Sequence, residues 1–115
     1  MDVAIVGCGE IASAYAEGLS EYPDLPLVAT ADLERSRAES LAERYGADAF
    51  GALETLLAES GADLILNLTI HDAHASVTRA CLEAGRHVVS EKPLALDAET
   101  ARALVDLADR EGLVL

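Results

Sequence analysis

The sequence predicts an α/β fold in which a doubly wound parallel sheet lies between two layers of helices, giving three layers. Short apolar runs alternate with longer helical patterns along the 115 residues, an order typical of parallel strands joined by right-handed crossovers. The first apolar run leads into a glycine turn, and the second ends in an acidic residue. We therefore expect a single domain over residues 1–115 with the strand order 3-2-1-4-5-6. Such a sheet binds ligands at the carboxyl ends of its strands.

The first half of the chain contains three strand patterns, each followed by a helical pattern. Residues 22–26, which include two prolines, end the first helical pattern, because proline cannot continue a helix. Gly46 ends the second helical pattern. The third strand pattern is short, so we place it at an edge of the sheet. The expected strands lie at residues 2–6, 27–31 and 47–50, and the expected helices at 10–20, 34–45 and 53–59.

The second half repeats this alternation and holds the clearest strand pattern. Residues 64–68 are nearly all apolar, as expected of a strand that is covered on both faces. Asp72 suits the N-cap of the next helix, Gly85 ends that helix, and Gly112 ends the last one. The expected strands lie at residues 64–68, 87–90 and 113–115, and the expected helices at 72–84 and 97–111.

The turn Gly7-x-Gly9-x-x-Ala12 stands between the first strand and the first helix. Gly7 can adopt the dihedral angles of a tight turn, Gly9 leaves room for a phosphate, and Ala12 lets helix and strand pack closely. The free N–H groups and the dipole of the helix then face an anion. The turn thus suits a dinucleotide phosphate, although a tight strand-to-helix turn without a ligand uses the same residues. The other residues of this candidate site are Cys8, Glu10 and Ile11.

Asp32 follows the second strand at the spacing that a dinucleotide site requires. A carboxylate there can accept both hydroxyls of the adenosine ribose, and it would repel a 2′-phosphate, which favours NAD over NADP. Leu33 and Arg35 lie beside it, and the guanidinium of Arg35 leaves NADP possible because it could bind that phosphate. The alternative is that Asp32 only caps the next helix.

Charge and cysteine content restrict the partners. The net charge of −13 argues against nucleic acid or an anionic membrane as a partner, so an anionic cofactor must be held mainly by backbone donors and a helix dipole. We find no signal peptide and no apolar run long enough to span a membrane, and we expect a cytoplasmic protein. Cys8 and Cys81 form no disulfide framework; both read as small buried residues, with a redox role as the alternative.

Lys92 is the only lysine among eight basic residues, and it lies between Glu91 and Pro93 after the fifth strand. A lysine ammonium is a compact charge that can polarise a hydroxyl or carbonyl group. The alternative interpretation is an ordinary surface pair of Glu91 and Lys92, which contributes little to stability.

The glycine turn, Asp32, the loop from Thr69 to His74 and residues 84–95, AGRHVVSEKPLA, together resemble the amino-terminal domain of the Gfo/Idh/MocA oxidoreductases. The resemblance covers essentially the whole chain, and residues 84–95 are its most specific part. It implies a dinucleotide-binding Rossmann domain of an enzyme that transfers a hydride between a nicotinamide cofactor and a sugar, polyol or related substrate.

The resemblance also implies roles for individual residues. The glycine turn would hold the pyrophosphate, and Asp32 would hold the adenosine ribose. Glu91 would contact the nicotinamide ribose, and Lys92 would orient the substrate hydroxyl as the catalytic residue. Pro93 would follow a cis peptide bond. The loop along the nicotinamide half of the cofactor would be formed by Leu68, Thr69, His71 and His74.

This sequence departs from the family pattern in two ways. Ile70 and His71 stand where the family usually has a proline, which predicts a more mobile or differently shaped loop. Family members also continue into a second domain that supplies the substrate pocket and most of the homo-oligomer interface. The chain therefore resembles the cofactor domain of a longer enzyme, and alone it should bind cofactor with negligible turnover.

Three other interpretations are weaker. His71, Asp72 and His74 have a spacing that permits a metal site, but no full ligand set accompanies them, so we expect no metal. A nucleotide-sensing regulatory module would share the glycine turn and the acid, but it has no need of Lys92. A methyltransferase would lack the stretch that leads to Glu91.

Overall fold

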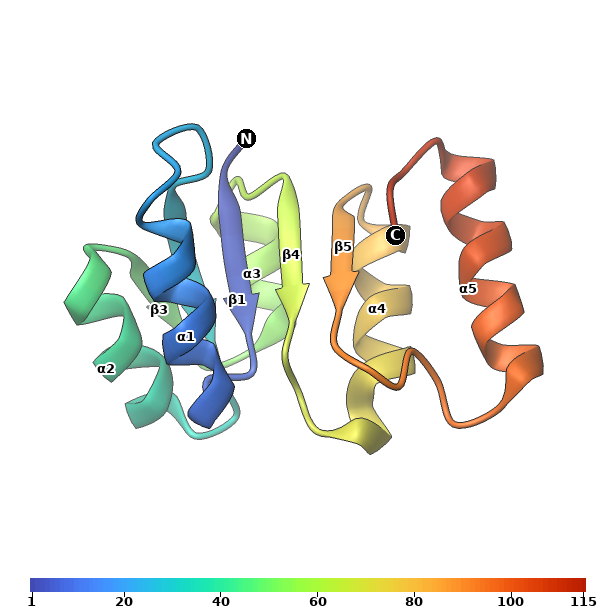
Figure 1. Cartoon of the computed structure of the whole chain (residues 1–115), viewed down its shortest axis with the longest axis horizontal. Coiled ribbons are helices and arrows are strands. Elements are labelled where there is room, and N and C mark those ends of the chain that lie inside the picture. Colours follow the sequence, from blue (N-terminus) through green and yellow to red (C-terminus); the bar gives the residue numbers. More distant parts are fainter.

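The computed structural model describes residues 1–115, and its centre is one sheet of five parallel strands. The strands follow the order β3-β2-β1-β4-β5, and every neighbouring pair is parallel. Their carboxyl ends therefore meet at one edge, the lower edge in Figure 1. The strands are β1 (Val3–Val6), β2 (Leu27–Ala31), β3 (Asp48–Phe50), β4 (Leu64–Asn67) and β5 (His87–Ser90).

Helices cover both faces of the sheet, which confirms the three-layer α/β fold. Helices α1 (Glu10–Leu19) and α2 (Arg35–Tyr45) lie on one face. Helices α3 (Leu53–Glu59) and α4 (His74–Glu83) lie on the other. Helix α5 (Ala98–Glu111) packs beside α4 beyond the β5 edge. None of these helices combines the length and the apolar character that a membrane span requires.

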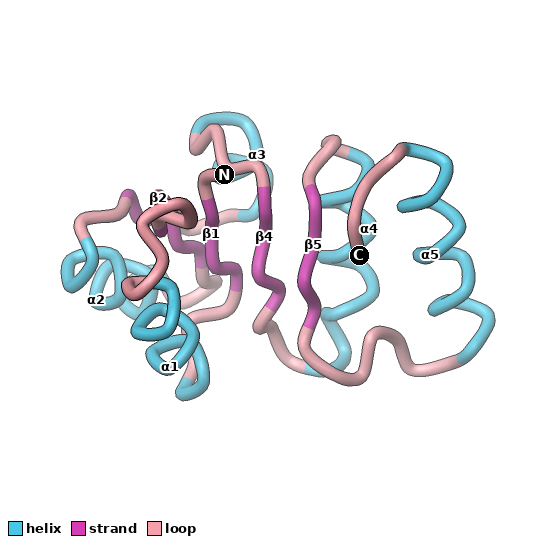
Figure 2. The backbone as a smooth tube through the Cα atoms, turned by 45° about the horizontal axis from the view of Figure 1, so that its top comes forward, coloured by secondary structure: helices cyan, strands magenta, loops and turns pink.

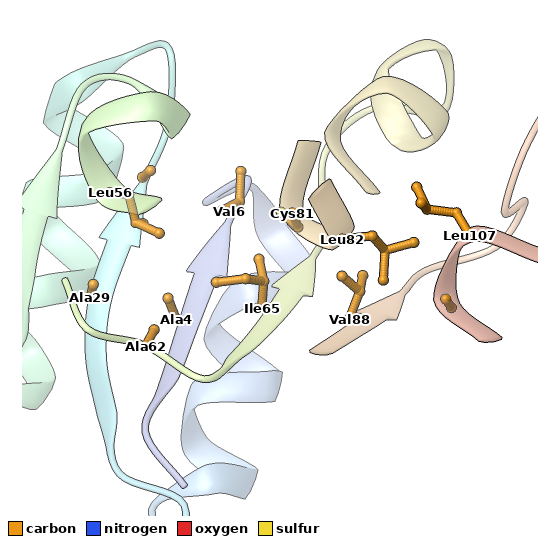
Figure 3. Close-up of a cluster of buried hydrophobic side chains, with 12 residues drawn as sticks. Ala4, Val6, Ala29, Leu56, Ala62, Ile65, Cys81, Leu82, Val88 and Leu107 are labelled. Carbon is orange, nitrogen blue, oxygen red and sulfur yellow. The ribbon is translucent and has the colours of Figure 1, made fainter. Parts of the chain in front are cut away.

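The core is divided between the two faces, because successive strand residues point to opposite sides. Val3 and Ile5 of β1 pack with α1 and α2, whereas Ala4 and Val6 belong to the cluster under α3, α4 and α5. Figure 3 shows this second cluster, in which Ile65 and other strand side chains meet those of the helices. All four of these β1 side chains are buried, so β1 is the central support of the carboxyl edge.

The expected sixth strand is not formed. The segment from Leu113 to Leu115 lies beside β5 (Figure 2), and the Val88 N–H donates to the Val114 carbonyl over 3.0 Å. The Val114 N–H, however, donates to Nδ1 of His87 over 3.0 Å. Because a side chain takes the donor that a ladder would need, only one backbone bond connects this segment to β5 and no strand results.

The expected N-cap role of Asp72 is also wrong. Asp72 lies in a 3₁₀ turn, η1 (His71–Ala73), and Ala73 stands at the N-cap of α4 with no side-chain cap. Side-chain capping is instead found at α5, where Asp97 accepts hydrogen bonds from the N–H and hydroxyl of Thr100 over 2.7 and 2.9 Å. These bonds lower the pKa of the Asp97 carboxyl below its usual value.

Candidate cofactor site

The loops after β1, β2 and β4 enclose a cleft of about 340 Å³ at the carboxyl edge of the sheet. The cleft lies where the strand order changes sides, from β2 on one side of β1 to β4 on the other, and doubly wound sheets bind ligands at this point. The sequence-predicted residues that line it are Gly7, Gly9, Asp32, Leu33, Leu68 and Thr69. Cys8, Glu10 and Ala12 border an adjoining hollow between α1 and α2 instead.

Gly7 is required by both its dihedral angle and its neighbour. Its φ is +93°, a backbone angle that residues with a Cβ rarely adopt. A Cβ at this position would also lie 2.5 Å from the carbonyl carbon of Leu68. Gly9 differs, because a Cβ at Gly9 would meet nothing within 4 Å. Gly7 thus lets β1 and β4 approach each other, while the space at Gly9 is open to a ligand.

The start of α1 offers unpaired donors to that space. Gly9 is the N-cap and makes no side-chain cap, and the N–H groups of Gly9, Glu10 and Ile11 have no backbone acceptor. These groups and the helix dipole suit an anion. The open space at Gly9 and the free donors together fit the pyrophosphate of a dinucleotide.

Asp32 joins the glycine turn to the turn before α2. Its Oδ2 accepts from the Cys8 N–H over 2.8 Å, and its Oδ1 accepts from the Glu34 N–H over 2.8 Å. Glu34, and not Asp32, is the N-cap of α2, so helix capping alone does not explain the residue. Each carboxylate oxygen can accept a second hydrogen bond, and Asp32 faces the cleft with capacity for two ribose hydroxyls.

The arginine beside the cleft is not the one expected. Arg37 lines the cleft, whereas Arg35 borders a separate hollow near Gly51 and pairs with Glu39 at 3.0 Å. Arg37 pairs with Glu34, so its charge is locally balanced. The direction of a helical side chain depends on the position of its residue around the helix. Nearness in sequence to Asp32 therefore could not show which of the two arginines faces the cleft.

A buried polar network fixes the loop after β4. Asn67, which is 0% exposed, accepts from the Thr69 N–H and hydroxyl over 3.3 and 2.7 Å. Its amide donates to the His74 carbonyl and the Thr78 hydroxyl, both over 2.9 Å. The loop is thus anchored from within the strand, although the family proline is absent and the exposed Ile70 stands in that segment.

His74 ties this loop to the one after β5. It is 1% exposed, and its Nδ1 and Nε2 lie 2.7 Å from the carbonyl oxygens of Pro93 and Thr69. With both ring nitrogens engaged, His74 positions two loops and offers no free nitrogen to a ligand. His71 is exposed, and no group of three or more His, Cys, Asp or Glu residues could hold a metal ion.

Glu91 and Lys92 do not form the surface pair considered as an alternative. Oε2 of Glu91 accepts from the Tyr15 hydroxyl over 2.9 Å, and Lys92 is exposed and takes part in no ion pair. The expected cis peptide bond between Lys92 and Pro93 is confirmed. The ammonium of Lys92 therefore has no carboxylate partner within the chain.

Both cysteines are buried thiols, as the sequence predicts. Burial, followed by the charge of Asp32, raises the pKa of Cys8 to about 12. Burial likewise raises the pKa of Cys81 to about 12. A thiolate is the reactive form of cysteine, so at neutral pH both residues are in the unreactive thiol form, which does not favour a redox role.

Four residues of this region were missed by sequence reasoning. Asn67 carried a signal, because a polar residue in an apolar strand must find buried partners. Tyr15, Arg37 and Thr78 carried none, since their contacts depend on how separate elements pack.

Comparison with known proteins identifies the family. A family model described as an oxidoreductase family with an NAD-binding Rossmann fold, GFO_IDH_MocA, matches residues 1–115. The chain belongs to the Gfo/Idh/MocA oxidoreductases. Within that family, it is 38% identical over 115 residues to the myo-inositol dehydrogenase Hyg17 of Streptomyces leeuwenhoekii, covering 100% of this chain and 35% of that protein.

Two further Gfo/Idh/MocA relatives are similar over the same region. The D-glucoside 3-dehydrogenase of Escherichia coli strain K12 is 37% identical over 115 residues, which cover 98% of this chain and 33% of that enzyme. The crystal structure of GenD2 from gentamicin A biosynthesis, in complex with NAD, has a TM-score of 0.96 and 32% identity, covering 100% of this chain and 33% of that one. The chain thus spans about a third of the length of these relatives.

Proposed function

We propose that residues 1–115 bind a nicotinamide dinucleotide in the cleft at the carboxyl edge, with NAD preferred to NADP. The observation that carries the preference is the position of Asp32. Its carboxylate lines the cleft beside Gly7 and Gly9, where it would accept the adenosine ribose hydroxyls and repel a 2′-phosphate. Arg37 could favour that phosphate, but it is already paired with Glu34.

We also propose that the chain is the cofactor domain of a longer oxidoreductase that acts on a sugar, a polyol or a related hydroxyl or carbonyl compound. The relatives that support this are about three times as long, and a second domain would close the substrate pocket and carry the homo-oligomer interface. When bound, the cofactor supplies hydride exchange. Lys92 would donate a hydrogen bond to the reacting oxygen, and Glu91 would hold the nicotinamide-side ribose.

Thermal unfolding in the presence of NADH or NADPH tests the cofactor proposal. A ligand that binds only the folded state stabilises it by about 2.7 kcal/mol at a concentration 100 times its Kd. We expect NADH to raise the Tm more than NADPH does. In Asp32→Ala, with each shift taken from the ligand-free Tm of that variant, the preference should disappear. If neither dinucleotide raises the Tm, cofactor binding is contradicted. If Asp32→Ala keeps the same preference for NADH over NADPH as the unmodified chain, the role of Asp32 is contradicted.

A further inference from the structure

Tyr15 connects the helix of the glycine turn to the loop after β5. It lies on α1, its ring packs against the apolar cluster under that helix, and its hydroxyl donates to Oε2 of Glu91 over 2.9 Å. The two residues are 76 positions apart in sequence. The strands that precede them in the chain, β1 and β5, are separated in the sheet by β4, so the bond bridges parts of the fold that the sheet does not pair directly.

The backbone of Glu91 is fixed, but its side chain has one partner only. The Glu91 N–H donates to the Asn67 carbonyl over 3.0 Å, which holds the start of the loop at the end of β4. Among the side-chain hydrogen bonds of Glu91, the bond from Tyr15 is the single one. Oε1 of the carboxylate is left without a partner in the chain, so Tyr15 selects the carboxylate orientation and leaves the other oxygen free to accept.

The charge arrangement maintains Tyr15 as a donor. The hydrogen bond to Glu91, together with burial and the charge of that carboxylate, raises the pKa of Tyr15 above its usual value. A tyrosine that stays protonated gives a charge-assisted hydrogen bond to an ionised carboxylate, and such bonds are stronger than those between neutral groups.

We propose that Tyr15 is a positioning residue for the nicotinamide half of the cofactor, an inference that rests on the proposed function. Through its hydroxyl, Tyr15 holds Glu91 in the orientation that accepts hydrogen bonds from the nicotinamide-side ribose. The same helix presents its first N–H groups to the pyrophosphate, and Tyr15 lies about 7.5 Å further along it from Glu10 by the rise of an α-helix. One rigid element thus sets the spacing between the two parts of the cofactor site.

Binding of NADH and of ADP to the chain and to Tyr15→Phe tests this inference. ADP has the adenosine and the diphosphate but lacks the nicotinamide-side ribose. We expect the Kd of NADH to rise about 3- to 10-fold in Tyr15→Phe, the range expected for one lost hydrogen bond, and the Kd of ADP to stay unchanged. Tyr22→Phe is the matched control, because Tyr22 is 60% exposed and its hydroxyl makes no hydrogen bond.

A double-variant comparison separates positioning from a general structural effect. In Glu91→Ala, the partner of Tyr15 is gone, so adding Tyr15→Phe should change the NADH Kd no further. Equal weakening of NADH and ADP, an unchanged NADH Kd in Tyr15→Phe, or a persisting effect in the Glu91→Ala background would each overturn the inference alone. Failure of the unmodified chain to bind NADH would overturn the proposed function, and this inference with it.

Discussion

Gly7 is the residue whose replacement should damage the fold most directly. In Gly7→Ala, the positive φ alone costs about 1–3 kcal/mol, and overlap of the new Cβ with the Leu68 carbonyl carbon 2.5 Å away adds to that cost. We expect urea denaturation to show a loss above about 3 kcal/mol. Gly18→Ala is the matched control, because Gly18 lies in α1 with open space around it, and it should gain about 1 kcal/mol.

The two buried thiols should make the folded state less stable as the pH rises into the alkaline range. Because the pKa of both thiols rises from 9.0 to about 12 in the folded chain, the unfolded state ionises first. Their contribution is fully present below pH 9.0 and decreases up to about pH 12, by about 1.4 kcal/mol per pH unit for each thiol. Denaturation midpoints measured across this range should fall.

The double variant Cys8→Ala/Cys81→Ala is the control for this pH dependence. Tyrosine and lysine groups also titrate in alkali, so the variant should keep their share of the slope and lose the share of the thiols. Equal slopes in the two proteins would show that folding does not raise the pKa of the thiols.

At the scale of the elements, Asn67 holds β4, its loop and α4 together. Asn67→Ala would leave the buried Thr78 hydroxyl without its donor and the Thr69 hydroxyl without its acceptor, and a buried polar group left unsatisfied costs about 1–3 kcal/mol. We expect a loss of that order in urea and a weaker NADH Kd, because Thr69 loses its anchor at the cleft. Ser76→Ala, at an exposed position of the same helix, should change neither. A stable variant with unchanged Kd would show that the loop is held otherwise.

The sequence predicts the elements of this fold well where local patterns decide them. Apolar runs and helix-ending glycines place β1 to β5 and the five helices, and the glycine turn places the cleft. The prediction of a sixth strand is wrong, because strand pairing at residues 113–115 depends on which acceptor the Val114 N–H meets. That acceptor is His87, a side chain from another element, and no local pattern shows it.

The site is predictable to the same extent. Gly7, Gly9 and Asp32 follow from spacing, since a turn and a strand end fix their positions. The Tyr15 bond to Glu91 and the His74 bonds to two carbonyls arise only when α1, α4 and the loops pack. Such contacts join residues far apart in sequence, and a single sequence carries no record of them.

At the scale of the whole molecule, the cofactor site lies in a strongly acidic protein. The net charge is −13, and three of the seven arginines are paired with a neighbouring glutamate. The donors that face the cleft at the start of α1 are backbone groups, which act over short distances. Long-range electrostatics should therefore oppose the approach of an anionic dinucleotide, while short-range donors bind it.

This repulsion predicts that the association rate constant of NADH rises with salt concentration. The Debye length falls from about 30 Å at 0.01 M salt to about 8 Å at 0.15 M, so added salt screens the repulsion more than the contacts inside the cleft. In stopped-flow fluorescence, we expect the association rate constant to rise with salt, whereas a site built on unpaired arginines would show a fall. The variant Asp106→Lys/Asp109→Lys/Glu111→Lys alters exposed residues of α5 and its end and reduces the net negative charge without touching the cleft. It should show a faster association at low salt and a smaller rise. A rate that falls with salt in the unmodified chain would show that local positive charge at the cleft, Arg37 above all, outweighs the field of the whole molecule.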